Sequence, residues 1–260
     1  MKKLPIAVRC GAIAGLILAG GLSASAQSLV LQLQAANYNP ATGVWTDTSG
    51  NGDNATYSGS AIPTLVAGVT PNGSAAVDFG NAGVMSLATA IPAGNYTAFA
   101  YIMPLDGGDH AIFGGTGYSA VEWRTYQGHQ NVLNEWNAQI GGGSGTISSS
   151  GFNLIDMTVS PSGGVMNLNG VADGTTSGFT PTAPITFIGN NYGAGGGEAF
   201  AGDIAEVDIY NGVLSPTQIS GIEENLMSEY VTTPEPTTWV MMAGGFGMLF
   251  AIRRFRRPQA

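Results

Sequence analysis

Oxygen-bearing side chains alternate along the run DTSGNGD, at Asp47, Ser49, Asn51 and Asp53. Oxygens at relative positions one, three and five, with a glycine at position six, are also how an EF-hand calcium loop begins. The twelfth position is Ser58, however, where such a loop needs a bidentate glutamate. We therefore do not expect an EF-hand here.

Two interpretations of this run remain. The favoured one is a turn in which Asn51 and Gly52 adopt positive φ and Asp47 caps nearby backbone amides. The alternative is a single calcium ion held by Asp47, Asp53, backbone carbonyls and carboxylates from elsewhere in the chain. Calcium is the one cofactor that the sequence suggests.

A second oxygen-rich loop lies in LDGGDH, where Asp106, Asp109 and His110 are close together. A calcium site at a sandwich rim is one interpretation, and a solvated loop is the one we favour. The two histidines, His110 and His129, are too few and too far apart to indicate a metal or catalytic centre.

The region richest in aromatic side chains is YSAVEWRTYQGHQNVLNEWNAQI. A hairpin in which paired residue numbers sum to 259 places Trp123 opposite Trp136 and Arg124 opposite Glu135. The tryptophans either form a sugar-stacking platform or pack between the sheets, and we favour the buried placement because side chains of this size are usually buried. A platform would also use three other residues of the hairpin, Glu122, Tyr126 and Asn137.

These residues must be positioned mainly by strands. Short apolar runs between turn signals predict strands over 29–33, 75–79, 97–103, 111–113, 120–126, 132–140, 154–159, 165–168, 185–188 and 202–210. Regular spacing and glycine-rich turns favour an all-β antiparallel sandwich over βαβ units. One helix is predicted to begin with Ser215 as N-cap and Pro216 in its first turn, and to continue to Tyr230.

Alternation along the last predicted strand divides it into two faces. The face expected between the sheets carries Ala205, Val207 and Ile209. The other face carries Ile204, Glu206, Asp208 and Tyr210, and we expect it to point to solvent or into a groove.

Charge is distributed unevenly along the chain. Seven of the eight basic residues lie near the two ends, which leaves Arg124 alone among the seventeen acidic residues between Asp47 and Glu235. The segment from Asp47 to Glu235 therefore carries 1 − 17 = −16. A domain with one cation cannot neutralise phosphates, which effectively excludes nucleic acid and anionic membrane surfaces as its partners. Cations and neutral sugars remain as partners.

The first 26 residues have the pattern of a secretory signal peptide, which signal peptidase removes. The pattern consists of basic Lys2, Lys3 and Arg9, an apolar run over 10–22, and a small-residue cleavage site at Ala24 and Ala26 before Gln27. A first transmembrane helix is the alternative, but the apolar run is short and polar sequence follows it. The only cysteine, Cys10, lies inside this leader, so we expect no disulfide in the mature chain.

The other end of the chain has three ordered parts. They are a linker over 231–236 with the motif Pro234, Glu235 and Pro236, an uncharged apolar stretch over 237–252, and a basic tail over 253–260 with Arg253, Arg254, Arg256 and Arg257. As a helix the apolar stretch reaches about 24 Å, enough to span a thin membrane with the arginines in the cytoplasm.

The segment TPEPTTWVMMAGGFGMLFAIRRFRR resembles the PEP-CTERM sorting signal of Gram-negative bacteria that make exopolysaccharide. The resemblance implies that a membrane protease, exosortase, cuts near the PEP motif and releases the protein to the cell surface or matrix. Before cutting, the helix would anchor the chain in the inner membrane. An ordinary tail anchor is the alternative.

Three stretches over 27–230 together resemble the laminin-G-like, concanavalin A-like jelly roll. They are WTDTSGNGDNATYSG, NLIDMTVSPSGGVMNLNGVADGT with its Asn169-Gly170 hairpin, and the closing strand and helix FAGDIAEVDIYNGVLSPTQISGI. The resemblance implies one antiparallel jelly-roll sandwich with a short C-terminal helix, of a kind that binds carbohydrate.

The run AEVDIYN also resembles the E-x-D-x-x-E triad of laminarinase-like glycoside hydrolases. Glu206 and Asp208 match, but Asn211 stands where the acid is needed, and an amide cannot supply its proton. We therefore expect no enzyme activity, and the hydrolase stays an alternative.

We expect an exported surface or matrix protein whose jelly-roll domain binds carbohydrate or exopolysaccharide. The main alternative is a structural or adhesion protein of the matrix that associates through calcium.

Overall fold

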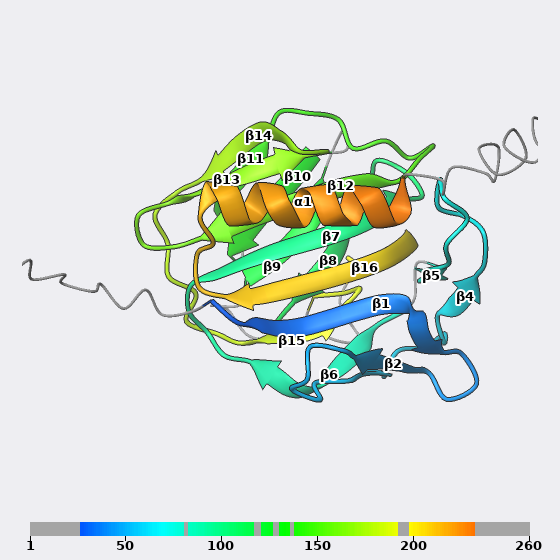
Figure 1. Cartoon of the computed structure of the whole chain (residues 1–260). Helices are drawn as coiled ribbons and strands as arrows, with labels where there is room; N and C mark the ends of the chain where they lie inside the picture. Colours follow the sequence, from blue (N-terminus) through cyan, green and yellow to red (C-terminus); the bar gives the residue numbers. More distant parts are fainter. Residues whose placement is uncertain are drawn as a thin grey trace, which may run out of the picture.

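The computed structural model describes residues 27–80, 83–116, 121–126, 130–135, 138–191 and 198–231. In this part of the chain sixteen strands and one helix form a two-layer sandwich in which every strand pair is antiparallel (Figure 1). The predicted all-β jelly-roll architecture is confirmed.

The first layer carries the C-terminal helix on its outer face (Figure 1). In spatial order its strands are β14 (Val171–Thr176), β13 (Gly164–Leu168), β12 (Asn153–Val159), β7 (Tyr96–Pro104), β16 (Gly202–Asn211) and β1 (Leu29–Asn39), with β5 (Ala76–Asp78) and β4 (Thr64–Val66) beside one end of β16. β16 pairs along one edge with β7 and along the other with β1 and then β5.

The second layer lies behind the first in Figure 1. In spatial order its strands are β2 (Val44–Asp47), β3 (Ala55–Tyr57), β6 (Met85–Ile91), β15 (Ile185–Ile188), β8 (His110–Gly114), β9 (Val121–Tyr126), β10 (Gln130–Glu135) and β11 (Ala138–Gly143). Pairing of β1 with β2 and of β11 with β14 joins the two layers.

The main core fills the space between the layers. Its largest fully buried side chains include Trp45, Trp123, Phe79, Phe113 and Phe200. Each side chain of this size contributes roughly 1.5–3 kcal/mol on burial, which lets a domain without disulfides in its described residues hold itself together. The indole N–H of Trp45 donates to the Gln34 carbonyl at 2.7 Å, so its polar atom is satisfied as well.

A bulge in β16 changes its predicted alternation. The register against β7 shifts between Ile204 and Glu206, and Ile204, Val207 and Ile209 all belong to the core between the layers. Ala205 packs instead on the outer face, against the helix side. The prediction was therefore correct for Val207 and Ile209 and wrong for Ala205 and Ile204, because one extra residue in a strand exchanges the two faces.

The predicted helix is α1 (Pro216–Tyr230), with the expected Ser215 cap. The Ser215 hydroxyl accepts from the Gln218 N–H, and the Gln218 side chain accepts from the Ser215 N–H, which makes a capping box. Figure 1 shows α1 lying across β7 and β12. A second apolar cluster holds it there, built from Leu214, Ile219, Leu226 and Tyr230 of the helical segment and Phe99, Tyr101 and Leu154 of the sheet.

The register of the β9–β10 hairpin differs from the predicted one. Paired residue numbers sum to 256, so Trp123 lies opposite Leu133 and Arg124 opposite Val132. Burying Trp123 and Leu133 in the core contributes more free energy than a cross-strand aromatic or ionic pair, which contributes only about 0.2–1 kcal/mol. The predicted pairing of Arg124 with Glu135 is therefore wrong.

Most predicted strands are present, but β2, β3, β4, β6 and β14 were not predicted. The predicted strand over 132–140 is divided between β10 and β11. Asn169 and Gly170 have φ of 53° and 76° and form the tight turn between β13 and β14, as an Asn-Gly hairpin requires.

Candidate functional site

Asp47, at the end of β2, is the centre of the DTSGNGD loop and is 7% exposed. Its Oδ1 accepts from the backbone N–H of Gln32 at 3.0 Å and of Ser49 at 2.9 Å. Its Oδ2 accepts from the N–H of Gly52 and of Asp53, both at 3.0 Å, and from the Ser49 hydroxyl at 2.8 Å. Burial alone would raise the pKa of Asp47, but these hydrogen bonds outweigh it and hold the pKa below its usual value.

The capping role predicted for Asp47 is confirmed. Gly52 has a positive φ of 79°, as predicted. The other left-handed residue of the loop is Gly50, with φ of 96°, so the prediction of positive φ for Asn51 is wrong. The Asn51 amide instead donates to the Leu29 and Val30 carbonyls, which ties the loop to β1. A calcium ion at Asp47 would have to displace the N–H and O–H donors that already surround both oxygens.

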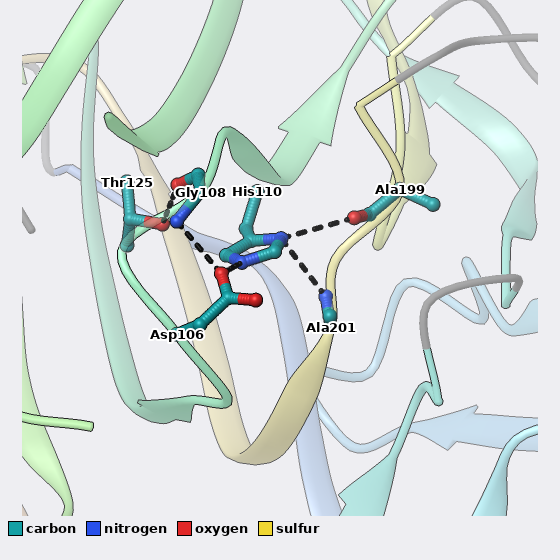
Figure 2. Close-up of polar contacts among 6 residues, drawn as sticks. All are labelled: Asp106, Gly108, His110, Thr125, Ala199 and Ala201. Atoms are coloured by element: carbon teal, nitrogen blue, oxygen red, sulfur yellow. Dashed lines mark hydrogen bonds and ion pairs between the residues drawn. The ribbon is translucent and has the colours of Figure 1, made fainter. Parts of the chain in front are cut away.

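The second oxygen-rich loop is organised around His110 (Figure 2). Oδ1 of Asp106 accepts from the Gly108 N–H and from Nε2 of His110, both at 2.7 Å. With the proton on Nε2, Nδ1 of His110 accepts from the Ala201 N–H at 3.3 Å, while the Ala199 carbonyl lies 3.3 Å away (Figure 2).

These contacts hold the segment that carries Glu198. The Ala111 N–H donates to the Glu198 carbonyl at 2.9 Å, and His110 binds the same segment through Ala199 and Ala201. The Thr125 hydroxyl reaches the Gly108 carbonyl at 3.5 Å, which links this loop to β9 (Figure 2). His110 therefore positions Glu198 beside β9.

A polar cluster on β9 and β10 follows from this arrangement. Arg124 Nη1 lies 2.7 Å from Glu198 Oε1, 3.6 Å from Glu122 Oε1 and 3.7 Å from Asp109 Oδ2. Asn134, in the amide orientation that satisfies both neighbours, accepts from Nε of Arg124 at 3.1 Å and from Nη2. We call Arg124, Glu122, Glu198, Asp109, Asn134 and Asn191 the Arg124 cluster.

The cluster lies on the face of the second layer that points away from the core, since Trp123 and Leu133 of the same strands face inward. Glu122, Arg124 and Asn134 are 5–8% exposed, whereas the side chains of Glu198 and Asp109 are 29% and 33% exposed. Two carboxylates thus form the solvent-accessible edge of a buried polar site.

Glu122 and Glu198 have pKa shifts in opposite directions. Burial, with the hydrogen bond to Glu198, raises the pKa of Glu122 to about 8, although Arg124 opposes the shift. Burial would also raise the pKa of Glu198, but the hydrogen bond from Glu122 and the charge of Arg124 outweigh it and lower that pKa. At neutral pH, Glu122 is protonated and Glu198 ionised, so one proton is shared between them.

Close approach of the backbone shapes the same site. Gly114 of β8 pairs with Glu122, and a Cβ added at Gly114 would lie 3.0 Å from the Asn191 Cα. Asn191 can therefore reach Glu198, to whose Oε2 its amide donates at 2.7 Å. Any larger residue at position 114 would separate Asn191 from the cluster.

The aromatic residues predicted as a platform are placed differently. Trp123 is fully buried in the core, and its indole N–H donates to Asn131 Oδ1 at 2.6 Å, so the buried placement favoured by the sequence is confirmed for Trp123. Trp136 and Asn137 lie outside the described residues, as does the side chain of Tyr126. Of the predicted binding residues with a described side chain, only Glu122 belongs to the Arg124 cluster.

Glu206 and Asp208, which match part of the hydrolase triad, lie beneath α1 and are 2% and 3% exposed. The Tyr230 hydroxyl donates to Glu206 Oε2 at 2.6 Å, and the Gln32 amide donates to its Oε1 at 3.0 Å. Burial and the charge of Glu206 raise the pKa of Asp208 well above its usual value. Because both carboxyl groups are buried and Tyr230 of α1 bonds to Glu206, the expectation that this face points to solvent or into a groove is wrong.

A second pair of carboxyl groups joins α1 to β12. The Asn167 amide donates to Asp156 Oδ1 at 3.0 Å and to Glu223 Oε1 at 3.2 Å. Asp156 is fully buried, and burial, with hydrogen bonding to and repulsion from Glu223, raises its pKa to about 8. A proton on Asp156 therefore joins the two carboxyl groups.

No group of three or more His, Cys, Asp or Glu side chains in the described part of the chain is placed to hold a metal ion. Among the predicted calcium ligands, Asp106 accepts a hydrogen bond from His110, and Asp109 lies beside Arg124. The backbone N–H of Asp53 donates to Asp47. No helix within the described residues has the length and apolarity to cross a membrane. The predicted signal peptide and the predicted 237–252 helix with its flanking motifs lie outside those residues.

The sequence did not identify Glu198, Asn134 and Asn191 as site residues. One signal was available, because Arg124 is the single Lys or Arg between residues 10 and 252 and its partners mark where that charge is used. The hairpin pattern predicts Glu135 as the partner of Arg124, but the observed partner, Glu198, comes from a segment more than 70 residues away in sequence.

Comparison with known proteins places this arrangement in context. A family model described as the concanavalin A-like lectin/glucanases superfamily matches residues 72–220. No curated protein matches the chain.

Three solved structures share the fold. Domain 4 of AbnA, a GH43 extracellular arabinanase from Geobacillus stearothermophilus solved in complex with arabinotriose, is 16% identical with a TM-score of 0.60, and the match covers 76% of this chain and 98% of that domain. A GH54 α-L-arabinofuranosidase is 14% identical with a TM-score of 0.55, covering 74% of this chain and 51% of that one. A Trypanosoma rangeli sialidase mutant is 17% identical with a TM-score of 0.54, covering 80% and 34%.

Proposed function

Because this chain belongs to the concanavalin A-like lectin/glucanase superfamily, we propose that it is a non-catalytic, exported module that binds carbohydrate through the Arg124 cluster. The observation that carries the proposal is a set of buried polar atoms without a hydrogen-bond partner. Glu122 Oε1 and Asn191 Oδ1 are both of this kind in the described part of the chain.

Buried acceptors without a hydrogen bond cost about 1–3 kcal/mol each, so native proteins retain few of them, and a water, an ion or a ligand that completes the site is one reason for keeping them. Sugar hydroxyls are the donors that fit, because they can donate to one oxygen and accept from a neighbouring N–H. The exposed edge formed by Glu198 and Asp109 gives such a ligand a route to the buried atoms.

The likeness to the arabinanase domain, whose structure contains arabinotriose, supports the choice of arabinan among the polymers to be tested. The chain covers about half of the arabinofuranosidase and one third of the sialidase. Their catalytic activities therefore give no support for an activity of this chain.

Binding is tested by isothermal titration of the purified protein with the neutral polymers arabinan, galactan, xylan and mixed-linkage β-glucan and the acidic polymers polygalacturonate and alginate. We expect at least one polymer to bind, and Asn191→Ala to weaken that binding about tenfold, which corresponds to about 1.4 kcal/mol. Asn191→Ala removes both the unpaired oxygen and the amide that holds Glu198.

Asn225→Ala provides the matched control, since Asn225 is exposed on α1, a helix packed on the other layer. It should bind like the unchanged protein. Wild-type affinity in Asn191→Ala would refute the assignment of the site. The absence of binding to every polymer, acidic ones included, would refute carbohydrate binding and favour the structural alternative.

The ends of the sequence support export as part of the proposal. We expect signal peptidase to release a chain that begins at Gln27, and exosortase to act near Pro234, Glu235 and Pro236, so that the domain reaches the surface or matrix. Intact-mass analysis of the protein recovered from the producing bacterium checks both ends. A mass that includes residues 1–26 would contradict export through this leader.

A further inference from the structure

We infer that the Arg124 cluster selects neutral glycans and rejects glycans that carry carboxylates. The inference rests on the proposed function and narrows its ligand class. It follows from three features of the described residues: the state of the single guanidinium, the kind of polar atom left unpaired, and the charge around the site.

The guanidinium of Arg124 already has anionic and polar partners on several sides. Glu198 binds Nη1 at 2.7 Å, Glu122 and Asp109 lie within 3.7 Å of the same nitrogen, and Asn134 accepts from Nε and Nη2. A carboxylate on a ligand would have to replace Glu198 to reach this cation. The usual means of binding an acidic sugar, a bidentate arginine, is therefore occupied by the protein itself.

The polar atoms of the cluster that lack a hydrogen-bond partner are acceptors. Glu122 Oε1 and Asn191 Oδ1 can each receive a hydrogen bond but cannot give one. A sugar hydroxyl supplies the missing proton, whereas an ionised carboxylate has no proton to supply and would place two acceptors together. The site therefore complements hydroxyl groups and opposes carboxylates.

Charge around the cluster acts in the same direction. Arg124 is surrounded by Asp109, Glu198 and the proton-sharing Glu122, and no other Lys or Arg occurs between residues 10 and 252. The electrostatic potential at the exposed edge is thus negative. It repels an anionic polymer and has no such effect on a neutral one. Salt would screen this repulsion without changing the contacts.

The first experiment changes the ligand and leaves the protein unaltered. A neutral polysaccharide that binds and carries free primary hydroxyls, such as galactan or mixed-linkage β-glucan, is oxidised stepwise at those hydroxyls to carboxylates and then reduced back with carbodiimide and borohydride. We expect affinity to fall at least tenfold as carboxylates are introduced, and to return after reduction. Undiminished binding of the oxidised polymer would overturn the selectivity while leaving carbohydrate binding intact.

A direct comparison uses unrelated acidic polymers. Polygalacturonate and alginate are titrated beside arabinan, galactan, xylan and β-glucan at low salt. Binding to a uronate polymer with no neutral polymer bound would likewise overturn the inference but preserve the proposed function. Failure of every polymer, acidic and neutral, would instead overturn the proposed function itself.

The second experiment asks whether Glu198 blocks the cation. Glu198→Gln removes the carboxylate closest to Arg124 and should raise affinity for polygalacturonate at least fivefold, because the guanidinium becomes available. Glu224→Gln removes the same charge from an exposed position on α1, on the other layer, and should leave polygalacturonate binding unchanged. Equal gains in the two variants would show that net charge, and not Glu198, governs the rejection.

Discussion

Replacing Asp47 by alanine is expected to lower the free energy of unfolding by about 3–5 kcal/mol, because the substitution leaves several half-buried amides without an acceptor. Four backbone N–H groups and one hydroxyl donate to this carboxylate at 2.8–3.0 Å. The groups come from β1 and from the turn after β2, so the whole loop depends on one side chain. Thermal melting should show a fall of about 6–15 °C.

Asp53→Ala is the matched control for this prediction. Asp53 belongs to the same loop and carries the same charge, but it contributes its backbone N–H and not its carboxylate to the Asp47 network. Its melting temperature should change by no more than about 2 °C. Comparable losses in the two variants would contradict the central role of Asp47. A melting temperature that rises when calcium is added to the unchanged protein, but not to Asp47→Ala, would revive the calcium interpretation.

Replacing Asp156 by asparagine is expected to stabilise the protein at pH 8 by up to about 5 kcal/mol, or about 10–20 °C in melting temperature. Asparagine has nearly the same shape, and its amide can donate to Glu223 at every pH. The native aspartic acid can do so only while it keeps its proton. Once Asp156 loses its proton, the buried pair consists of two carboxylates that repel each other.

The pH range of this effect follows from the two pKa values of Asp156. In the folded state the pKa is raised to about 8 by burial and by Glu223, whereas its usual value is 3.8. The folded protein therefore keeps a proton that the unfolded chain releases, and the stability contributed by Asp156 is complete below about pH 4 and lost as the pH rises to about 8. The advantage of Asp156→Asn should accordingly grow from near zero at pH 4 to its full value at pH 8.

Melting curves of both proteins between pH 4 and pH 9 measure this difference. Glu224→Gln supplies the control, since it removes a charge from the exposed side of the same helix. A difference between Asp156→Asn and the unchanged protein that stays constant with pH would show that Asp156 is ionised throughout.

Local chemistry made part of this fold predictable from the sequence. Ser215 and Pro216 specify the start of α1, and Asn169 with Gly170 specifies a turn, because caps and left-handed turn residues act over a few positions. The acceptor role of Asp47 followed in the same way from its place before a glycine-rich turn.

Features that depend on distant segments were not predictable in this way. The bulge at Ala205 exchanges the faces of β16 through its pairing with β7, and nothing in the strand's own alternation indicates it. Side-chain pairs predict one register for β9 and β10, whereas packing of Trp123 and Leu133 in the core gives another. Glu198 reaches Arg124 because His110 and Ala111 bind its backbone, which is a tertiary relation between separate parts of the chain.

The pairing of β1 with β16 affects the order in which the chain can fold. These neighbouring strands of the first layer come from opposite ends of the domain, with Leu33 opposite Val207. During synthesis β1 therefore emerges long before the strand that it must pair with, and the layer cannot close until residue 211 is available. Such a long loop makes folding slow, on the order of milliseconds to seconds. A chain built in this way cannot complete its first layer before most of the domain has been made, and this delay would suit the export proposed above.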